Sequence, residues 1–166
     1  VIENRRALAA FLNDFAALEG SKIIVHGGGK EATLMAQQLG IPVQMIDGRR
    51  VTDAATLDLI TMVYGGKINK TIVAQLQALD CNALGFTGAD GNSITALKRS
   101  PQPVDFGFVG DVSKVETALL KVLFQQGITP VFCAITHDGA GQLLNTNADT
   151  VAASLAKALA TDFEVQ

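Results

Sequence analysis

The sequence predicts an α/β fold, in which a mostly parallel central sheet lies between two layers of helices and carries β-hairpin excursions. Short apolar runs of strand length alternate along the chain with stretches whose apolar residues recur at helical spacing. Such alternation is typical of parallel sheets that are covered on both faces. With 166 residues, 48% of them hydrophobic, the chain has the length and apolar content of one core. We therefore expect residues 1–166 to form a single domain.

The first part of the chain predicts helix, strand, glycine loop, helix and strand. Helical periodicity begins behind Asn4 and ends at Gly20, a typical helix stop. The apolar run at residues 22–26 predicts a strand, and residues 31–39 have the composition of a helix. Residues 43–46 predict the next strand.

A tight turn and a long helical stretch follow. The dipeptide at residues 47–48 is a turn signal, and Thr52 can cap a helix over residues 53–64. The glycine pair at residues 65–66 is expected to interrupt this helix. A second helix is then predicted over residues 68–76.

The middle of the chain predicts mainly strands. Residues 83–86 resemble a buried strand. Residues 94–98 and 104–108 have strand composition and are separated by prolines, which predicts an antiparallel excursion. The apolar run at residues 128–135 is rich in β-branched residues, and a hairpin tip is expected at residues 138–139.

Two further helices are marked by capping residues. Ser113 and Glu116 have the spacing of a capping box, which predicts a helix from there to Gly127. Asn147 is expected to cap the last helix, whose apolar residues recur four positions apart.

Charge and cysteine content exclude several kinds of protein. Thirteen Lys and Arg against sixteen Asp and Glu create no basic field for a nucleic-acid backbone, so no nucleic-acid partner is expected. No apolar run approaches the ~18 residues of a membrane span, and the start lacks a signal-peptide pattern. Cys81 and Cys133 stand singly in apolar runs, which predicts buried thiols and favours a reducing cytoplasm.

Both ends of the chain look incomplete. The sequence does not start with methionine, and residues 161–166 begin a strand-like run without a successor. We expect the domain to be truncated at both ends.

A glycine triplet between a strand and a helix is the first candidate site. Gly27, Gly28 and Gly29 let backbone amides approach an anion at the positive end of a helix dipole, which suits a phosphate or a carboxylate. A plain tight turn explains the same residues equally well. His26 is more typical of a strand-end histidine satisfied by the backbone than of a catalyst.

An arginine pair after the predicted turn is the second candidate. Either Arg49 or Arg50 could offer its planar fork to a carboxylate just before a helix. Judged by charge alone, a solvated surface pair is the more common arrangement.

The third candidate is a polar stretch at a helix start. In an extended segment residues two apart face the same side, so Asn145, Asn147 and Asp149 could converge. The same residues could simply cap the helix and complement its dipole.

Other site patterns are weaker. The sequence shows no Ser-His-Asp constellation and no close set of metal ligands, so no metal site is expected, and Gly29-Lys30 lacks the rest of a P-loop. Residues 27–32 also fit the dinucleotide fingerprint G-x-G-x-x-A, with Asp47 about twenty residues on. A Rossmann-type domain is therefore an alternative, although it leaves Arg50 and the asparagines without a role.

Taken together and in this order, these motifs resemble the N-acetylglutamate kinases of the amino acid kinase family. The resemblance implies a three-layer α/β/α sandwich that phosphorylates the side-chain carboxylate of an N-acylglutamate, acetylated or succinylated, in arginine or ornithine biosynthesis. The matching segments span nearly the whole chain: Val25-His26-Gly27-Gly28-Gly29, Gly48-Arg49-Arg50-Val51-Thr52-Asp53, Gly66-Lys67-Ile68-Asn69-Lys70, Gly107-Phe108-Val109-Gly110-Asp111-Val112 and Asn145-Thr146-Asn147-Ala148-Asp149.

The resemblance also implies roles for single residues. Gly28 and Gly29 would place amides near the reacting groups, and Arg50 would clamp the α-carboxylate of the substrate. Asn145 and Asn147 would be further substrate contacts. Asp149 would orient the catalytic lysines rather than act as a base.

ATP with Mg²⁺ is the implied co-substrate, and a homodimer or higher homo-oligomer is implied through the helices around residues 64–76. The lysines of the family pattern are expected before Val1 and after Gln166, so we expect this segment alone to lack kinase activity. A module that binds an acyl amino acid without turnover is the remaining alternative.

Overall fold

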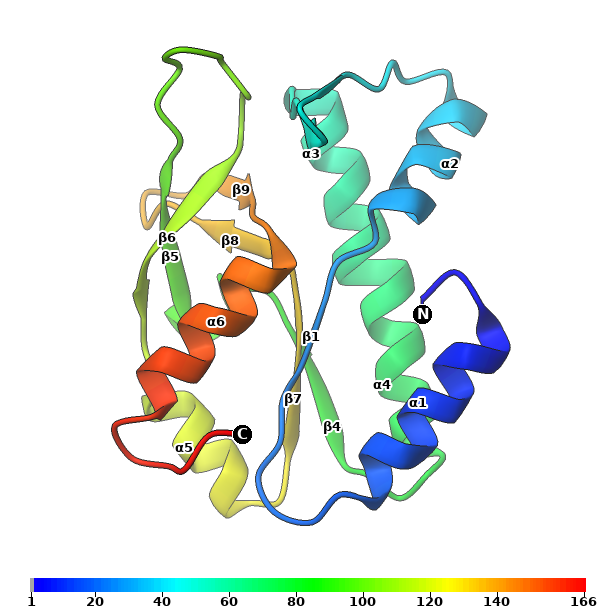
Figure 1. The fold of residues 1–166 in the computed structure, drawn as a ribbon, viewed down its shortest axis with the longest axis vertical. Coiled ribbons are helices and arrows are strands. Elements are labelled where there is room, and N and C mark those ends of the chain that lie inside the picture. The colour runs from blue at the N-terminus through cyan, green and yellow to red at the C-terminus, as the bar shows by residue number, and fades with distance from the viewer. Residues whose placement is uncertain (1) are drawn as a thin grey trace.

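A computed structural model describes residues 2–166 and shows a mixed α/β fold with one parallel and one mixed sheet (Figure 1). The parallel sheet has the strand order β1 (Ile24–His26), β7 (Thr129–Cys133) and β4 (Ala83–Phe86). β7 is fully buried in the centre, as expected for a strand with parallel partners on both sides.

Helices cover both faces of the parallel sheet, and the burial of β7 shows why. Val131 and Cys133 pack into one apolar cluster, whereas Phe132 between them packs into the other. On the first side lie α1 (Arg5–Ala17) and the long helix that ends with α4 (Asn69–Gln77). On the second side lie α5 (Ala118–Gln125) and α6 (Ala148–Leu159).

The predicted helix break at residues 65–66 is wrong. α3 (Ala54–Ile60), the π-helical segment η1 (Thr61–Ile68) and α4 follow one another without interruption. A β-carbon on Gly65 would lie 3.8 Å from Thr87 Cγ2 and 4.0 Å from Cys133 Sγ. These are ordinary van der Waals distances, so Gly65 simply packs beside Thr87 and Cys133 within the continuous helix. The cap is Asp53, not Thr52, because the Asp53 carboxylate accepts the Thr56 N–H at 2.8 Å.

The excursions form a separate four-stranded sheet in the order β6 (Gly110–Val115), β5 (Ile94–Lys98), β8 (Ile135–His137) and β9 (Leu143–Asn145). β6 pairs with β5 and β8 with β9 in antiparallel fashion, whereas β5 and β8 are parallel. The hairpin at residues 138–139 is confirmed. Residues 94–98 form an antiparallel pair as predicted, but with residues 110–115 instead of residues 104–108. The long run at residues 128–135 is split, because its end joins this second sheet.

The predicted capping box is wrong, because its residues belong to the second sheet. Ser113 lies in β6 and donates its hydroxyl to Thr95 O at 3.1 Å. Helix α5 starts only after Thr117, which makes no side-chain cap. The partner strand of β5 is thus residues 110–115, and residues 104–108 form isolated bridges instead of a strand.

A small hairpin precedes the long helix and follows α2 (Gly29–Leu39). Its strands are β2 (Met45–Ile46) and β3 (Arg49–Arg50), so the strand expected at residues 43–46 is shorter than predicted. Asp47 (φ 49°) and Gly48 (φ 75°) form the turn, as the sequence indicated.

The chain ends are simpler. Asn147 caps α6, as predicted, and Asn4 caps α1. Cys81 and Cys133 are buried free thiols. Residues 161–166 form no strand, contrary to expectation, and a 3₁₀ turn η2 (Asp90–Asn92) follows β4. Within residues 2–166, every helix is too short or too polar to cross a membrane.

Candidate functional site

The glycine triplet forms the connection from the carboxyl end of β1 to the start of α2. Gly28 is the N-terminal cap residue of α2 and makes no side-chain cap, so the first amides of this 11-residue helix have no side-chain acceptor. Unmatched amides at the positive end of a helix favour an anion. In open parallel sheets ligands bind at this edge, beyond the carboxyl ends of the strands.

Gly28 has no room for a side chain. A β-carbon there would lie 2.3 Å from Ile68 Cδ1 and 2.9 Å from Tyr64 Cδ1. Both neighbours come from the π-helical segment η1. The loop is therefore held against the long helix.

Arg50 is brought to the same loop by the β2–β3 hairpin. Its Nη2 atom donates to Gly29 O at 2.9 Å and to Thr33 Oγ1 at 2.8 Å. The residue is only 9% exposed, and its Nη1 atom is buried without any hydrogen-bond partner among the described residues. Arg49, on the opposite side of β3, is exposed. Of the two candidate arginines, Arg50 is the one that points into the protein with unused donor capacity.

Asn145 lies near the hairpin although it is 93 residues further along the chain. Its Nδ2 atom donates to Thr52 Oγ1 at 3.0 Å, two residues beyond Arg50. Backbone bonds join the same elements, because Phe108 donates to Thr52 O and Asn145 donates to Phe108 O. The segment around Gly107 thus fixes the end of β9 beside β3.

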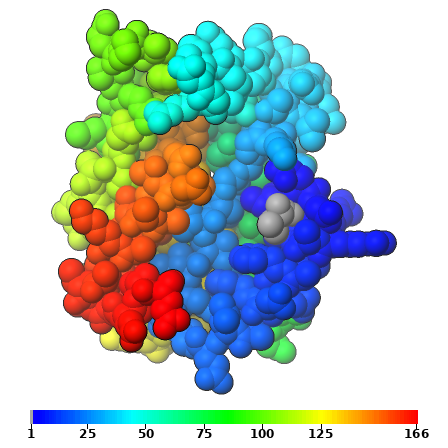
Figure 2. Space-filling model, viewed as in Figure 1, coloured from blue at the N-terminus to red at the C-terminus, as the bar shows by residue number. Residues whose placement is uncertain are grey.

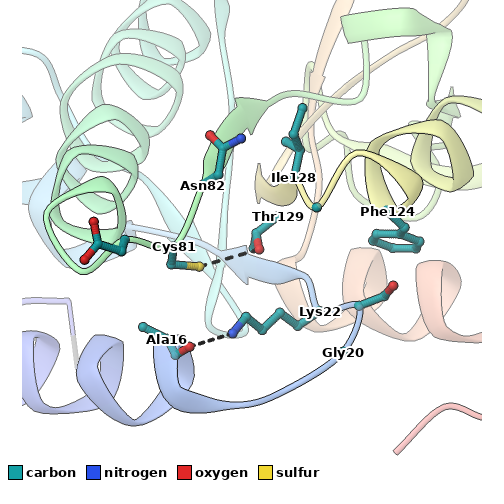
Figure 3. Close-up of a pocket in the computed structure, with 11 residues that line it drawn as sticks. Ala16, Gly20, Lys22, Cys81, Asn82, Phe124, Ile128 and Thr129 are labelled. Atoms are coloured by element: carbon teal, nitrogen blue, oxygen red, sulfur yellow. Dashed lines mark hydrogen bonds between the residues drawn. The ribbon is translucent and has the colours of Figure 1, made fainter.

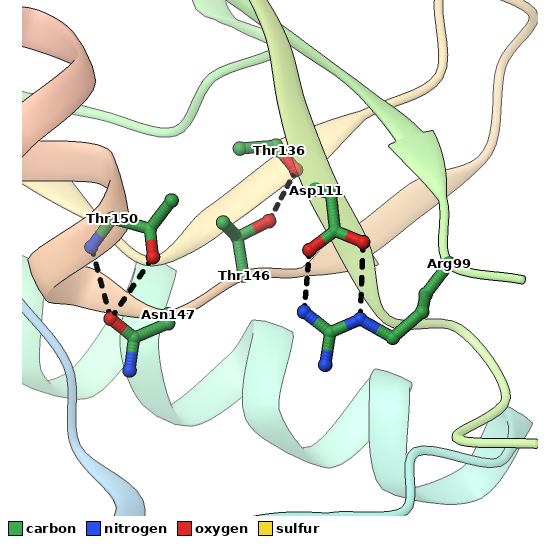
Figure 4. Close-up of polar contacts among 6 residues, drawn as sticks. All are labelled: Arg99, Asp111, Thr136, Thr146, Asn147 and Thr150. Carbon is green, nitrogen blue, oxygen red and sulfur yellow. Dashed lines mark hydrogen bonds and ion pairs between the residues drawn. The ribbon is translucent and has the colours of Figure 1, made fainter. Parts of the chain in front are cut away.

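The start of α6 lies against the glycine loop. A β-carbon on Gly27 would be 3.7 Å from Ala148 Cβ, so the first turns of α2 and α6 meet. Asn147 Oδ1 accepts the Thr150 N–H at 2.9 Å (Figure 4), which is the capping role that the sequence left open. Asp149 is exposed in the first turn of α6. Two helix N-termini therefore face the same region, and Figure 2 shows the surface set back there, between the start of α6 and the hairpin.

Side-chain bonds stiffen the neighbouring sheet. Arg99 binds both carboxylate oxygens of Asp111 across the β5–β6 pair, and this ion pair lowers the pKa of Asp111 (Figure 4). Thr136 and Thr146 share a buried hydroxyl bond of 2.7 Å. These contacts hold β6 and β9 in the positions that place Asn145.

His26 is part of the scaffold under the loop. It is 4% exposed, and Asn69 Nδ2 approaches its Nε2 atom at 3.1 Å while also donating to Val131 O. A carboxamide nitrogen only donates, so Nε2 accepts and Nδ1 carries the proton toward Gly27 O at 2.8 Å. His26 is thus satisfied as a neutral imidazole, as the sequence favoured.

Neutral His26 makes the fold sensitive to mild acid. Burial lowers its pKa below the ordinary 6.5, so the folded chain takes up this proton less readily than the unfolded chain. The free energy of unfolding should be independent of this group well above pH 6.5 and fall as the pH drops below 6.5 toward the folded-state pKa. Urea unfolding on both sides of that pH measures the effect.

His26→Gln should remove this pH dependence of stability. The control His137→Gln leaves the buried imidazole of His26 in place and should retain the pH dependence. Equal slopes of stability against pH for the wild type and His26→Gln would contradict the assignment.

A cavity of about 420 Å³ lies at the other edge of the sheet (Figure 3). Its lining includes Lys22, Cys81 and Thr129, which precede or begin the three parallel strands. The Lys22 ammonium group donates to Ala16 O at 2.8 Å and to Leu18 O, so it neutralises the end of α1. We therefore assign this cavity a structural character and place the candidate site at the glycine loop.

The structure thus brings Gly28, Gly29 and Arg50 into direct contact and sets Asn145 beside the same hairpin. Asn147 and Asp149 lie at the adjoining helix start, where Asn147 acts as a cap. Among residues 2–166, no group of three or more metal-ligating side chains could hold a metal ion.

Sequence reasoning assigned no site role to Thr33 or Tyr64. Thr33 lies one helical turn after Gly29, a spacing that could have indicated its contact with the loop. Tyr64 shares the buried face of the long helix with Leu57 and Ile60, a helical spacing that could have indicated its inward direction but not its neighbours.

The dinucleotide interpretation fails on geometry. Asp47 sits exposed at the tip of the β2–β3 hairpin, whereas a ribose-binding carboxylate belongs at the end of the second parallel strand.

Comparison with known proteins gives a consistent family. The model of the amino acid kinase family matches residues 1–162. A protein of Bacteroides fragilis named acetylglutamate kinase is 56% identical over 99% of this chain, and one of Parabacteroides distasonis with the same name is 58% identical over 99%. The chain spans 63% and 65% of the length of these two relatives.

Solved structures share the fold at low identity. The protein smu.665 from Streptococcus mutans UA159 superposes with a TM-score of 0.79 at 23% identity, over 92% of this chain and 61% of that one. N-acetylglutamate synthase from Neisseria gonorrhoeae, complexed with coenzyme A and N-acetyl-glutamate, also gives 0.79 at 21% identity, over 94% of this chain and 36% of that one. At these identities the likeness concerns the fold.

Proposed function

Because this chain belongs to the amino acid kinase family, we propose that the protein carrying it transfers a phosphoryl group from ATP to the side-chain carboxylate of an N-acylglutamate. Residues 1–166 supply the part that binds the acyl amino acid. The reaction is taken from relatives at 56% and 58% identity that are named acetylglutamate kinase.

One observation in this chain carries the substrate half of the proposal. Arg50 is nine-tenths buried at the glycine loop, and its Nη1 atom has no partner among the described residues. An unmatched buried donor costs about 1–3 kcal/mol, so its retention points to an acceptor that arrives with a ligand. Guanidinium groups match carboxylates in shape and charge. Arg50 is therefore assigned to the α-carboxylate.

The chemistry follows from positioning and charge. The substrate carboxylate is itself the nucleophile, and it attacks the terminal phosphorus in line while the bond to the leaving ADP oxygen breaks. Amides of Gly28 and Gly29, together with the meeting helix ends, stabilise negative charge where it develops. Asn145 and Asn147 orient the substrate, and Asp149 organises cationic groups rather than acting as a base.

ATP with Mg²⁺ is the co-substrate in this proposal. The described residues hold no cluster of metal ligands, so we derive no step through the ion from this chain. Binding of the nucleotide and neutralisation of its phosphates are assigned to parts of the protein outside residues 1–166.

The same proposal covers the architecture. The parallel sheet with helices on both faces is the core of a three-layer α/β/α sandwich, and residues 1–166 are one truncated domain of it. Pairing of copies along the helices around residues 64–76 gives a homodimer or a higher homo-oligomer, and sedimentation velocity tests that assembly.

Binding without turnover is the expected behaviour of the isolated chain. N-acetylglutamate should bind in isothermal titration calorimetry, because its carboxylate sites lie in residues 1–166, while ATP consumption should stay at background. A longer form that includes the flanking parts should turn over both substrates. Steady turnover by residues 1–166 alone would refute the division of labour, and a longer form that binds but never transfers phosphate would identify a binding module instead.

A further inference from the structure

The long helix presents a tyrosine to the candidate site from below the glycine loop. Tyr64 is 6% exposed and lies in η1, and its ring would touch a β-carbon on Gly28 at 2.9 and 3.0 Å. A β-carbon on Gly29 would lie 4.0 Å from the phenol oxygen. The hydroxyl therefore reaches the first turn of α2 from the protein interior. π-helical segments are frequent at functional sites.

Arg50 is the polar neighbour of this phenol. Burial raises the pKa of Tyr64, while the charge and donor groups of Arg50 act in the opposite direction. A guanidinium group only donates, so it offers no acceptor for the phenol proton. Among residues 2–166, no hydrogen bond from the Tyr64 hydroxyl to a protein acceptor is formed.

The Arg50 Nη1–H has no partner among residues 2–166, and the Tyr64 hydroxyl lies beside the same guanidinium group with its own proton still to donate. The amides at the start of α2 add further donors, since Gly28 supplies no cap. A buried group made only of donors, one of them cationic, is matched by an anion with several lone pairs. A carboxylate fits this description.

We propose that Tyr64 is a substrate-binding residue, whose hydroxyl donates to the same α-carboxylate of the N-acylglutamate that Arg50 clamps. This inference rests on the proposed function and extends it. Two side chains from different elements, Arg50 and Tyr64, would both bind the free α-carboxylate, so the substrate must carry that group. Ligands in which that group is an amide lose both partners.

Affinity measurements on Tyr64→Phe test the contact. Phenylalanine keeps the ring that packs on Gly28, so the loop is preserved while the hydroxyl is lost. A hydrogen bond to a charged group is worth about tenfold or more in affinity, so N-acetylglutamate should bind Tyr64→Phe at least about tenfold more weakly. Thr161→Val is a matched control, because it removes a hydroxyl bound to Ala158 O away from the site.

Spectroscopy gives an independent readout. Tyr64 is the single tyrosine of a chain without tryptophan, so the near-ultraviolet difference spectrum reports on this phenol alone. Adding N-acetylglutamate should produce a saturable tyrosine difference signal in the wild type. The α-amide of N-acetylglutamate should produce no such signal. Its affinity for Tyr64→Phe should equal its affinity for the wild type.

The outcomes separate the two proposals. Tight binding of N-acetylglutamate with a silent tyrosine and an unchanged Tyr64→Phe affinity would overturn the role of Tyr64 and leave the proposed function standing. An equal loss of affinity for acid and amide would also overturn it, since the hydroxyl would not act on the carboxylate. Absence of binding in the wild type would remove the proposed function and this inference together.

Discussion

Gly28→Ala should cost the fold about 1–3 kcal/mol and abolish binding of N-acylglutamate. The new methyl group would lie 2.3 Å from Ile68 Cδ1 and 2.9 Å from the Tyr64 ring, both of which are buried in the core. Something must therefore shift, and displacement of either buried side chain or of the loop disturbs the contact between the loop and the long helix. Because the amides of Gly28 and Gly29 are the proposed binding groups, a shift of about 1 Å is enough to lose their contacts with the substrate.

Urea denaturation and titration calorimetry measure the two effects, with Gly66→Ala as the matched control. A β-carbon on Gly66 meets no atom within 4 Å, and alanine favours a helix by about 1 kcal/mol. This variant should be as stable as the wild type or more so, with unchanged binding. If Gly28→Ala bound N-acetylglutamate normally, the loop would not be the anion site.

Local signals explain which elements were predictable. Asn147 places its oxygen on the N–H of Thr150 three residues ahead, and Asp47-Gly48 adopts the positive φ values that its residues favour. Each depends on neighbours within a few positions. The Asn147 cap and the hairpin turn were therefore readable from the sequence.

The errors arise where distant partners decide. Ser113 and Glu116 have the spacing of a capping box, but Ser113 lies in a strand that pairs with β5. Its hydroxyl donates to Thr95 O, 18 residues earlier in the sequence. The pair at Gly65 and Gly66 has the composition of a helix break, yet both residues lie within the continuous helix, where Gly65 packs beside Thr87 and Cys133. Neither contact is visible in local composition.

The site was predictable as a set of residue types and not as a geometry. Successive residues of a strand face opposite sides, so one member of the arginine pair had to point inward. The hairpin register decides that it is Arg50 rather than Arg49. The contacts of Arg50 with Thr33 and Tyr64 depend on the packing of three separate elements, which residue spacing within one element does not predict.

Arg50→Met should abolish binding of N-acylglutamate, with an affinity at least about a hundredfold lower. Methionine fills a similar apolar path but offers no charge and no donor. Arg50→Lys should recover only part of the affinity, because an ammonium group keeps the charge and loses the planar fork. Titration calorimetry of both variants, with Arg49→Lys on the exposed side of the same hairpin as control, measures this.

The effect of Arg50→Met on the free energy of unfolding should be small. The contrast between this small effect and the large loss of affinity distinguishes a binding role from a structural one. Arg50→Met removes two bonds, to Gly29 O and to Thr33 Oγ1, which favour the folded state. It also removes the buried Nη1 donor that has no partner, and that donor costs about 1–3 kcal/mol. Gly29 O keeps the Thr33 hydroxyl as a donor, so no acceptor is orphaned.

Gain and loss should therefore cancel to within about 1 kcal/mol, as at other sites where function is retained at the expense of stability. A residue kept for structure alone would behave differently, because Arg50→Met would then lower the urea midpoint strongly and leave binding of N-acetylglutamate intact. That pair of results would show that Arg50 Nη1 does not bind the carboxylate of the substrate.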